Sequence, residues 1–132
     1  MKKVLLTGAS GFIGRAFIHR FSSLPEFQFC GIARRVQPNL PDSVYYRSID
    51  LSKPFSLDFE PDVVIHAAGR ASPWGTKEQY QQQNVETLRQ IMAFCERNNF
   101  PRLIYLSSSA VFYRNEHQFG LTEDSPIGPD FI

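Results

Sequence analysis

The chain has 132 residues, enough for one domain with a sizeable hydrophobic core. Its 14 Lys and Arg nearly balance its 13 Asp and Glu, so nothing indicates a strongly charged surface for nucleic acid or membranes. No run approaches the apolar length of a membrane span, and the first strand begins almost at residue 1, so we expect a cytoplasmic protein without a signal peptide. Its two cysteines, Cys30 and Cys95, lack metal-ligand spacing, which favours buried thiols in a reducing compartment.

Strand-like runs recur along the chain, separated by helical or loop segments. They cover Lys3–Thr7, Phe27–Ala33, Val44–Ile49, Val63–Ala67 and Leu103–Ser107. The first, fourth and fifth runs are almost continuously apolar, as is typical of strands covered on both faces. This alternation predicts an α/β fold with a doubly wound parallel sheet of five strands, in the order 3-2-1-4-5.

Two helices are expected between these strands. The first is an amphipathic segment, Arg15–Phe21, and the second runs from about Thr76 to Asn98, with a capping box formed by Thr76 and Gln79. An apolar stripe on the second helix comprises Val85, Leu88, Met92 and Cys95, with Ile91 beside it. The Gln81–Gln83 triplet is interpreted as a solvated helix face.

Two segments have no helical period. The crossover Leu51–Pro61 contains two prolines, so we expect a loop or a single turn where such sheets usually carry a helix. Residues His117–Pro129 are polar and rich in Gly and Pro. We expect them to form a loop across the carboxyl ends of the strands, which is the ligand side of parallel sheets.

The most informative local pattern is a glycine turn between the first strand and the first helix. Its residues are Gly8, Ala9, Ser10, Gly11, Phe12, Ile13 and Gly14. Gly8 permits a sharp turn, Gly11 permits close approach of a pyrophosphate, and Gly14 permits close packing of the helix on the sheet. The alternative is a tight turn that binds no ligand.

The end of the second strand suggests which dinucleotide is bound. A protein specific for NAD places Asp or Glu there, but this sequence has Arg34 and Arg35 instead. Guanidinium groups pair with phosphate, so we expect NADP with its 2′-phosphate, and NAD as the alternative cofactor. The alternative, which we favour less, is that the two arginines are solvated surface residues.

Other strand ends carry residues suited to the same ligand. Asp50, followed by Leu51, could accept a hydrogen bond from the adenine amino group or could simply cap a loop. Ala67, Ala68 and Gly69 are small enough for a ribose to lie on their backbone, although close helix packing would also explain them.

Polar residues later in the chain are weaker candidates. Asn84 is a poor helix former within a predicted helix, so it either bonds to backbone near the site or faces water. Ser107 and Ser108 follow the fifth strand and could hydrogen-bond a substrate, although serines are common in loops. The sequence contains no metal-ligand spacing, no Gly-x-Ser-x-Gly elbow and no P-loop ending, so we expect no metal site.

These motifs together resemble the extended short-chain dehydrogenase/reductase family, in its NAD-dependent epimerase/dehydratase group. The matching stretches are Thr7–Gly14, Asp50-Leu51, Val64–Gly69, Asn84–Thr87, Leu106–Phe112 and Thr122–Pro126. Ser72–Gly75 is similar to the subset related to 3β-hydroxysteroid dehydrogenases and sugar-nucleotide epimerases. The resemblance covers nearly the whole chain and implies a Rossmann-type fold with a nicotinamide dinucleotide cofactor.

The resemblance also implies roles for individual residues. The implied cofactor-binding residues are Gly8, Ser10, Gly11, Phe12, Ile13, Gly14, Arg34, Arg35, Asp50, Leu51, Ala67, Ala68, Gly69, Asn84 and Ser107. Ser108 matches the catalytic Ser or Thr of the family. This sequence departs from the family pattern at Phe112-Tyr113, where the family more commonly has Tyr-Gly.

The family's catalytic Tyr-x-x-x-Lys motif is absent from the sequence. We therefore expect residues 1–132 to be an incomplete NAD(P)-binding domain, inactive by itself, from an epimerase, dehydratase or reductase that acts on a sugar-nucleotide or another bulky alcohol or ketone. The alternative is a stand-alone NADP(H)-binding or redox-sensing module. The fifth strand and the stripe of the long helix would then be uncovered, which predicts a homodimer or other self-association.

Overall fold

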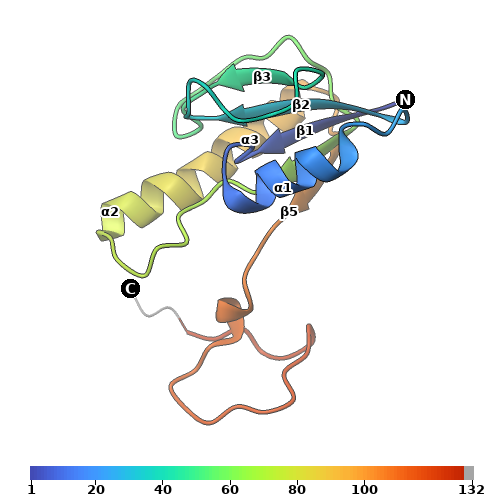
Figure 1. Ribbon diagram of the computed structural model, residues 1–132. Helices are drawn as coiled ribbons and strands as arrows, with labels where there is room; N and C mark the ends of the chain where they lie inside the picture. The colour runs from blue at the N-terminus through green and yellow to red at the C-terminus, as the bar shows by residue number, and fades with distance from the viewer. Residues whose placement is uncertain (130–132) are drawn as a thin grey trace.

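The computed structural model describes residues 1–129 and contains one parallel five-stranded sheet (Figure 1). Its strands are β1 (Lys2–Thr7), β2 (Phe27–Ala33), β3 (Tyr45–Ser48), β4 (Val63–His66) and β5 (Arg102–Tyr105). Their order is β3-β2-β1-β4-β5, and all four pairings are parallel. The predicted fold class and strand order are confirmed.

Helices cover the two faces of this sheet. The helix α1 (Phe12–Phe21) lies on one face, and a continuous helical segment made of α2 (Lys77–Tyr80), the π-helix η1 (Gln81–Glu86) and α3 (Thr87–Arg97) lies on the other. Alternate residues of β1 supply the two cores: Val4 and Leu6 pack towards α1, and Leu5 packs towards α3. A short 3-10 helix, η2 (Ser109–Phe112), follows β5.

The long helix begins and ends as predicted. The hydroxyl of Thr76 accepts from the backbone N–H of Gln79, and the Gln79 side chain accepts from the Thr76 N–H, so the capping box is confirmed. The helix ends before Asn98, and Asn99 adopts a left-handed φ of 59°, which turns the chain towards β5.

The predicted apolar stripe of this helix is met only in part, since Cys95 and its neighbour Ile91 are buried but Val85 and Met92 are not. Val85 and Met92 are 40% and 51% exposed, whereas the buried residues of α3 are Thr87, Ile91, Phe94 and Cys95. Thr87, Ile91 and Phe94 lie on one face of the regular helix α3, and this face packs on the sheet, so the buried face is centred away from Met92.

The crossover from β3 to β4 has no helix, as predicted. Its residues Leu51 and Phe59 are buried in the core beneath α3. The ring of Phe55 stacks on Phe94 at a centroid distance of 5.3 Å, and the Arg97 guanidinium donates to the Phe55 carbonyl at 2.9 Å. Apolar side chains of a loop thus cover the part of the sheet that a helix would otherwise cover.

The predictions for the C-terminal part of the chain are only partly met. β5 is an edge strand on which Ile104 and Tyr105 are exposed. The prediction that this strand is covered on both faces is therefore wrong. The described helices cover only one of its faces. The following segment leaves the sheet instead of crossing the strand ends (Figure 1). It is held by its own contacts, including the Gly128 N–H donating to the Val111 carbonyl at 2.8 Å.

Candidate functional site

A cavity of about 620 Å³ lies at the carboxyl ends of the strands. Its walls come from the segments after β1, β2, β3 and β4 and from the start of the long helix. The lining residues are Gly8, Ser10, Gly11, Ala33, Arg34, Arg35, Ile49, Asp50, Leu51, Ser52, Ala67, Ala68, Gly69, Gln82, Gln83 and Thr87. Most of the residues predicted at the strand ends are therefore brought together in one site.

The glycine turn forms the floor of this cavity. Gly8 has a φ of +68°, and a Cβ there would lie 2.7 Å from the Ala67 carbonyl oxygen. A Cβ on Gly14 would collide with the Gly8 carbonyl oxygen, so only glycine lets α1 approach this closely. Gly11 is the N-cap of α1, without a capping side chain and without an acidic residue in the first turn, so the helix presents uncapped N–H groups suited to an anion.

Three predicted residues of the turn stand apart from the cavity lining. The side chains of Phe12 and Ile13 are exposed, and Gly14 is buried against the turn. At these positions the structure offers backbone groups of the first helical turn, and the side chains contribute nothing to the cavity wall.

A buried polar pair fixes the wall that follows β4. The Thr7 hydroxyl oxygen accepts from the backbone N–H groups of Ala67 and Ala68, each at 3.1 Å. It also lies 2.7 Å from Nδ1 of His66. With its acceptor positions used, the hydroxyl donates its proton to Nδ1, so His66 carries its own proton on Nε2. Thr7 thereby holds the backbone of Ala67 and Ala68 against the end of β1.

His66 is 1% exposed, and its Nε2 has no hydrogen-bond acceptor within residues 1–129. Burial lowers the pKa of this imidazole to about 4, so the ring is neutral near neutral pH. No local sequence pattern marks His66 as a partner of Thr7. Its place at the end of β4, opposite Thr7, is the signal that could have paired the two residues.

The end of β2 presents two guanidinium groups to the cavity. Hydroxyl groups of β3 hold the backbone here: Ser48 donates to the Arg34 carbonyl at 2.9 Å, and Tyr46 donates to the Arg35 carbonyl at 2.5 Å. Neither arginine side chain forms an ion pair in the part of the chain that the structure describes. This wall therefore carries positive charge that no ion pair within residues 1–129 neutralises, although the charge of Arg34 acts on the nearby Asp50 carboxylate.

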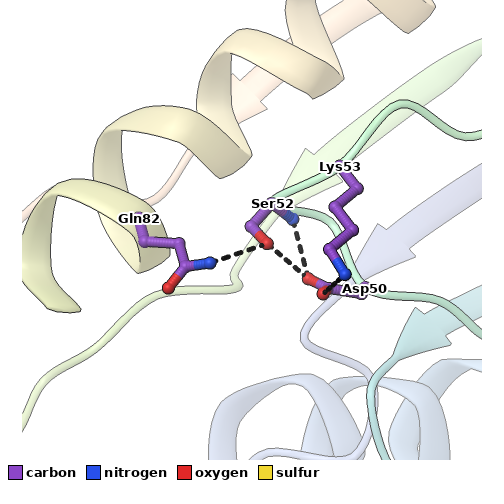
Figure 2. A network of polar contacts seen from close by, with 4 residues as sticks. All are labelled: Asp50, Ser52, Lys53 and Gln82. Atoms are coloured by element: carbon purple, nitrogen blue, oxygen red, sulfur yellow. Dashed lines mark hydrogen bonds and ion pairs between the residues drawn. The ribbon is translucent and has the colours of Figure 1, made fainter. Parts of the chain in front are cut away.

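The segment after β3 carries a chain of polar contacts (Figure 2). Asp50 Oδ1 accepts from the Ser52 hydroxyl at 2.7 Å and from the Ser52 N–H at 3.0 Å, and Lys53 lies 3.8 Å from Oδ2. The hydrogen bonds from Ser52, helped by the charges of Lys53 and Arg34, lower the pKa of Asp50 below its ordinary value. From the opposite wall, Gln82 donates to the Ser52 hydroxyl at 3.4 Å.

Asn84 acts on the loop after β4 and does not line the cavity. Its Oδ1 accepts from the Arg70 N–H at 2.7 Å, and a Cβ on Gly69 would lie 2.9 Å from the same oxygen. Asn84 lies in the π-helix, so its amide bonds to backbone beside the site, which is one of the two alternatives that its sequence position allowed.

The two predicted serines lie outside the cavity. Ser107 follows β5, and Ser108 is the N-cap of η2, where its hydroxyl accepts from the Ala110 N–H at 3.2 Å. Conversely, the sequence patterns did not indicate that Ser52, Gln82, Gln83 and Thr87 line the cavity. Gln82 is exposed, as a solvated helix face requires, and Gln83 is half-buried, but both also line the cavity.

Two further properties concern residues 1–129 as a whole. No three His, Cys, Asp or Glu side chains gather there in a way that could hold a metal ion. None of the helices in this range combines the length and apolar character that crossing a bilayer requires.

Both cysteines are free and buried, as predicted, and burial raises the pKa of the Cys30 thiol to about 12.

Residues 4–131 match the sequence model of the NAD dependent epimerase/dehydratase family. Two curated relatives are named 2-alkyl-3-oxoalkanoate reductase. The one from Stenotrophomonas maltophilia (strain K279a) is 29% identical over 145 residues, which cover 98% of this chain and 41% of the relative. The one from Shewanella oneidensis is 28% identical over 131 residues, which cover 96% of this chain and 34% of the relative.

Solved structures share the fold. UDP-galactose 4-epimerase superposes with a TM-score of 0.85 at 18% identity, over 96% of this chain and 45% of that one. MoeE5, solved in complex with UDP-glucuronic acid and NAD, gives a TM-score of 0.79 at 26% identity, over 96% of this chain and 43% of that one. The chain thus spans less than half the length of these relatives and structures.

Proposed function

The chain belongs to the NAD dependent epimerase/dehydratase family, and from this premise we propose that residues 1–132 are the cofactor-binding part of an NADP(H)-dependent reductase or epimerase. The observation that carries the choice of NADP(H) is the pair of arginines at the end of β2, Arg34 and Arg35, neither of which forms an ion pair within residues 1–129. An adenosine 2′-phosphate would supply an anion with which both guanidinium groups can pair.

The residues of the cavity fit a dinucleotide. The glycine floor leaves room for a pyrophosphate, and the uncapped N-terminus of α1 supplies N–H donors and a partial positive charge for it. Ala67, Ala68 and Gly69 form a small-residue wall suited to a ribose. Asp50 and Leu51 lie where the adenine would be expected, between the ends of β2 and β3.

The nicotinamide ring, when bound, supplies hydride transfer to or from a carbinol or ketone carbon. The residues of this chain bind and orient the dinucleotide, and Thr7 fixes the backbone of the ribose wall. We further propose that residues 1–132 do not turn over substrate by themselves, since no Tyr in the sequence is followed four residues later by Lys. Ser108 remains the proposed catalytic serine of the complete site.

The proposed substrate is a bulky ketone or alcohol, and the names of the curated relatives favour the reductase direction. Those relatives align with almost the whole chain and are named as reductases of 2-alkyl-3-oxoalkanoates. MoeE5 was solved with UDP-glucuronic acid, so a sugar-nucleotide is the second candidate substrate class.

Calorimetric titration with NADPH and NADH tests the cofactor assignment. We expect NADPH to bind more tightly, and Arg34→Ala to weaken NADPH binding by about 10- to 100-fold because it removes a charge-assisted contact of about 1.5–3 kcal/mol. NADH affinity should change little.

The matched control is Arg20→Ala, which removes an exposed arginine from the last turn of α1. It should leave both affinities unchanged. Equal binding of the two dinucleotides by the parent chain, or an equal effect of Arg34→Ala on both, would contradict the assignment to NADP(H).

A further inference from the structure

One contact in the cavity joins walls that lie far apart in the sequence. Gln82 comes from the π-helix η1, whereas Ser52 comes from the loop after β3, and Nε2 of Gln82 approaches the Ser52 hydroxyl to 3.4 Å (Figure 2). Both residues line the cavity beside Asp50, at the end where the proposed function puts the adenine.

The direction of the hydrogen bonds fixes how Gln82 is oriented. The Ser52 hydroxyl donates its single proton to Asp50 Oδ1 at 2.7 Å, so towards Gln82 it can only accept. Gln82 must therefore turn its NH₂ group to Ser52. Rotation of the carboxamide by half a turn would bring Oε1 against the Ser52 oxygen, whose single proton is already donated to Asp50.

This orientation leaves hydrogen-bonding capacity on Gln82. Within residues 1–129 its carboxamide makes no other hydrogen bond, so Oε1 and one N–H remain available beside the cavity. An acceptor and a donor side by side match the edge of adenine, whose amino group donates and whose adjacent ring nitrogen accepts. Hypoxanthine carries a carbonyl oxygen in place of that amino group and would face Oε1 with a second acceptor.

We propose that Gln82 reads the adenine base of the dinucleotide, and that Ser52 and Asp50 hold its carboxamide in the adenine-selective orientation. The proposal rests on the proposed function, because it requires an adenine dinucleotide in the cavity. It assigns a function to the glutamine triplet that the sequence pattern alone did not indicate.

The chain offers a matched control within the same triplet. Gln81 begins the π-helix immediately before Gln82, is exposed and does not line the cavity. Replacement of Gln81 by Ala therefore makes the same chemical change in the same helix without touching the site.

The test is calorimetric titration of the whole chain with NADPH and with its hypoxanthine analogue. We expect the parent chain to prefer NADPH by about 10-fold or more, as expected for one base-edge pairing. Gln82→Ala should lower this preference several-fold by weakening NADPH binding, and Ser52→Ala should lower it by freeing the carboxamide to turn. Gln81→Ala should leave the preference unchanged.

The outcomes separate this inference from the proposed function. A preference that is unchanged in Gln82→Ala, or one that Gln81→Ala lowers equally, overturns the inference while NADPH binding stands. A parent chain that binds neither dinucleotide overturns the proposed function, and the inference with it. Far-ultraviolet circular dichroism checks that each variant is folded. Ser52→Ala is an independent test of the same inference, because the Ser52 side chain is smaller than that of Gln82 and lies in a loop.

Discussion

At the scale of single residues, the Thr7–His66 pair links protonation to the shape of the cavity wall. The Thr7 hydroxyl can hold the Ala67 and Ala68 N–H groups because it gives its proton to a neutral imidazole. Protonation of Nδ1 would turn His66 into a third donor towards the same oxygen, beside the two backbone N–H groups. The backbone of the wall would then compete with the ring for one acceptor.

This arrangement predicts a pH dependence of stability. The unfolded chain binds a proton on His66 with a pKa of 6.5, whereas the folded chain binds it only near pH 4. Between these values the unfolded state holds more protons, so the free energy of unfolding falls as the pH is lowered from 6.5 to about 4. At about 1.36 kcal/mol per pH unit, the loss is about 3 kcal/mol.

The measurement is urea unfolding of the parent chain and of His66→Gln at several pH values in this range. His66→Gln should be less stable at pH 7 and should show a shallower decline towards pH 4, because one titrating group has been removed. His117→Gln, at an exposed position, is the control and should keep the slope of the parent. An identical slope for the parent and His66→Gln would refute this linkage.

At the scale of secondary-structure elements, the crossover between β3 and β4 behaves as part of the core although it has no helix. Phe59 is 8% exposed and belongs to the core beneath α3, and Phe55 stacks on Phe94 of that helix. Phe59 is buried and Phe55 is partly buried against the core, so both rings contribute apolar contacts to it. Substitutions here should therefore have the effects of core substitutions.

Phe59→Ala makes this expectation measurable. Removal of a buried aromatic side chain leaves a cavity, so the free energy of unfolding should fall by about 3 kcal/mol or more. Asp58→Ala, at the exposed neighbouring position, should change it by less than about 0.5 kcal/mol. Guanidinium unfolding followed by circular dichroism measures both changes, and a loss below about 1 kcal/mol for Phe59→Ala would mean that this loop is not part of the core.

The elements also show which features the sequence can predict. The strand order and the glycine turn follow from local signals, namely apolar runs, the Gly8–Gly14 pattern and the handedness of parallel crossovers. The π-helix does not, because Asn84 bonds across to the Arg70 backbone and no local pattern reports that contact. The exposure of Val85 and Met92 depends likewise on which face of the long helix packs on the sheet.

The same distinction applies to the candidate site. Residues at strand ends were predictable, because the carboxyl ends of parallel strands meet at one edge of the sheet, as Arg34, Asp50 and Ala67 do. Gln82 and Ser52 were not, because their proximity depends on the phase of a helix and on the path of a loop. The functional inference about Gln82 therefore needed the three-dimensional arrangement.

At the scale of the whole molecule, the sheet has an open apolar edge. Ile104, Tyr105 and Leu106 are 43%, 49% and 43% exposed at β5, which is the last strand of the sheet. Edge strands with apolar side chains and free backbone groups pair with other chains unless they are covered. On the far side of the cavity-facing helix, Val85 and Met92 add a second exposed apolar surface.

We therefore predict that residues 1–132 associate with themselves at high concentration, with β5 as the principal contact. Ile104→Lys should weaken the association by about 10-fold or more, because a charge replaces apolar surface that association would bury. Val36→Lys is the matched control, since Val36 is a 78% exposed apolar residue in the loop between β2 and β3. Sedimentation equilibrium over a concentration series measures the three proteins. A parent chain that stays monomeric throughout contradicts the prediction, and equal weakening by both variants would assign the association to general surface charge instead of to β5.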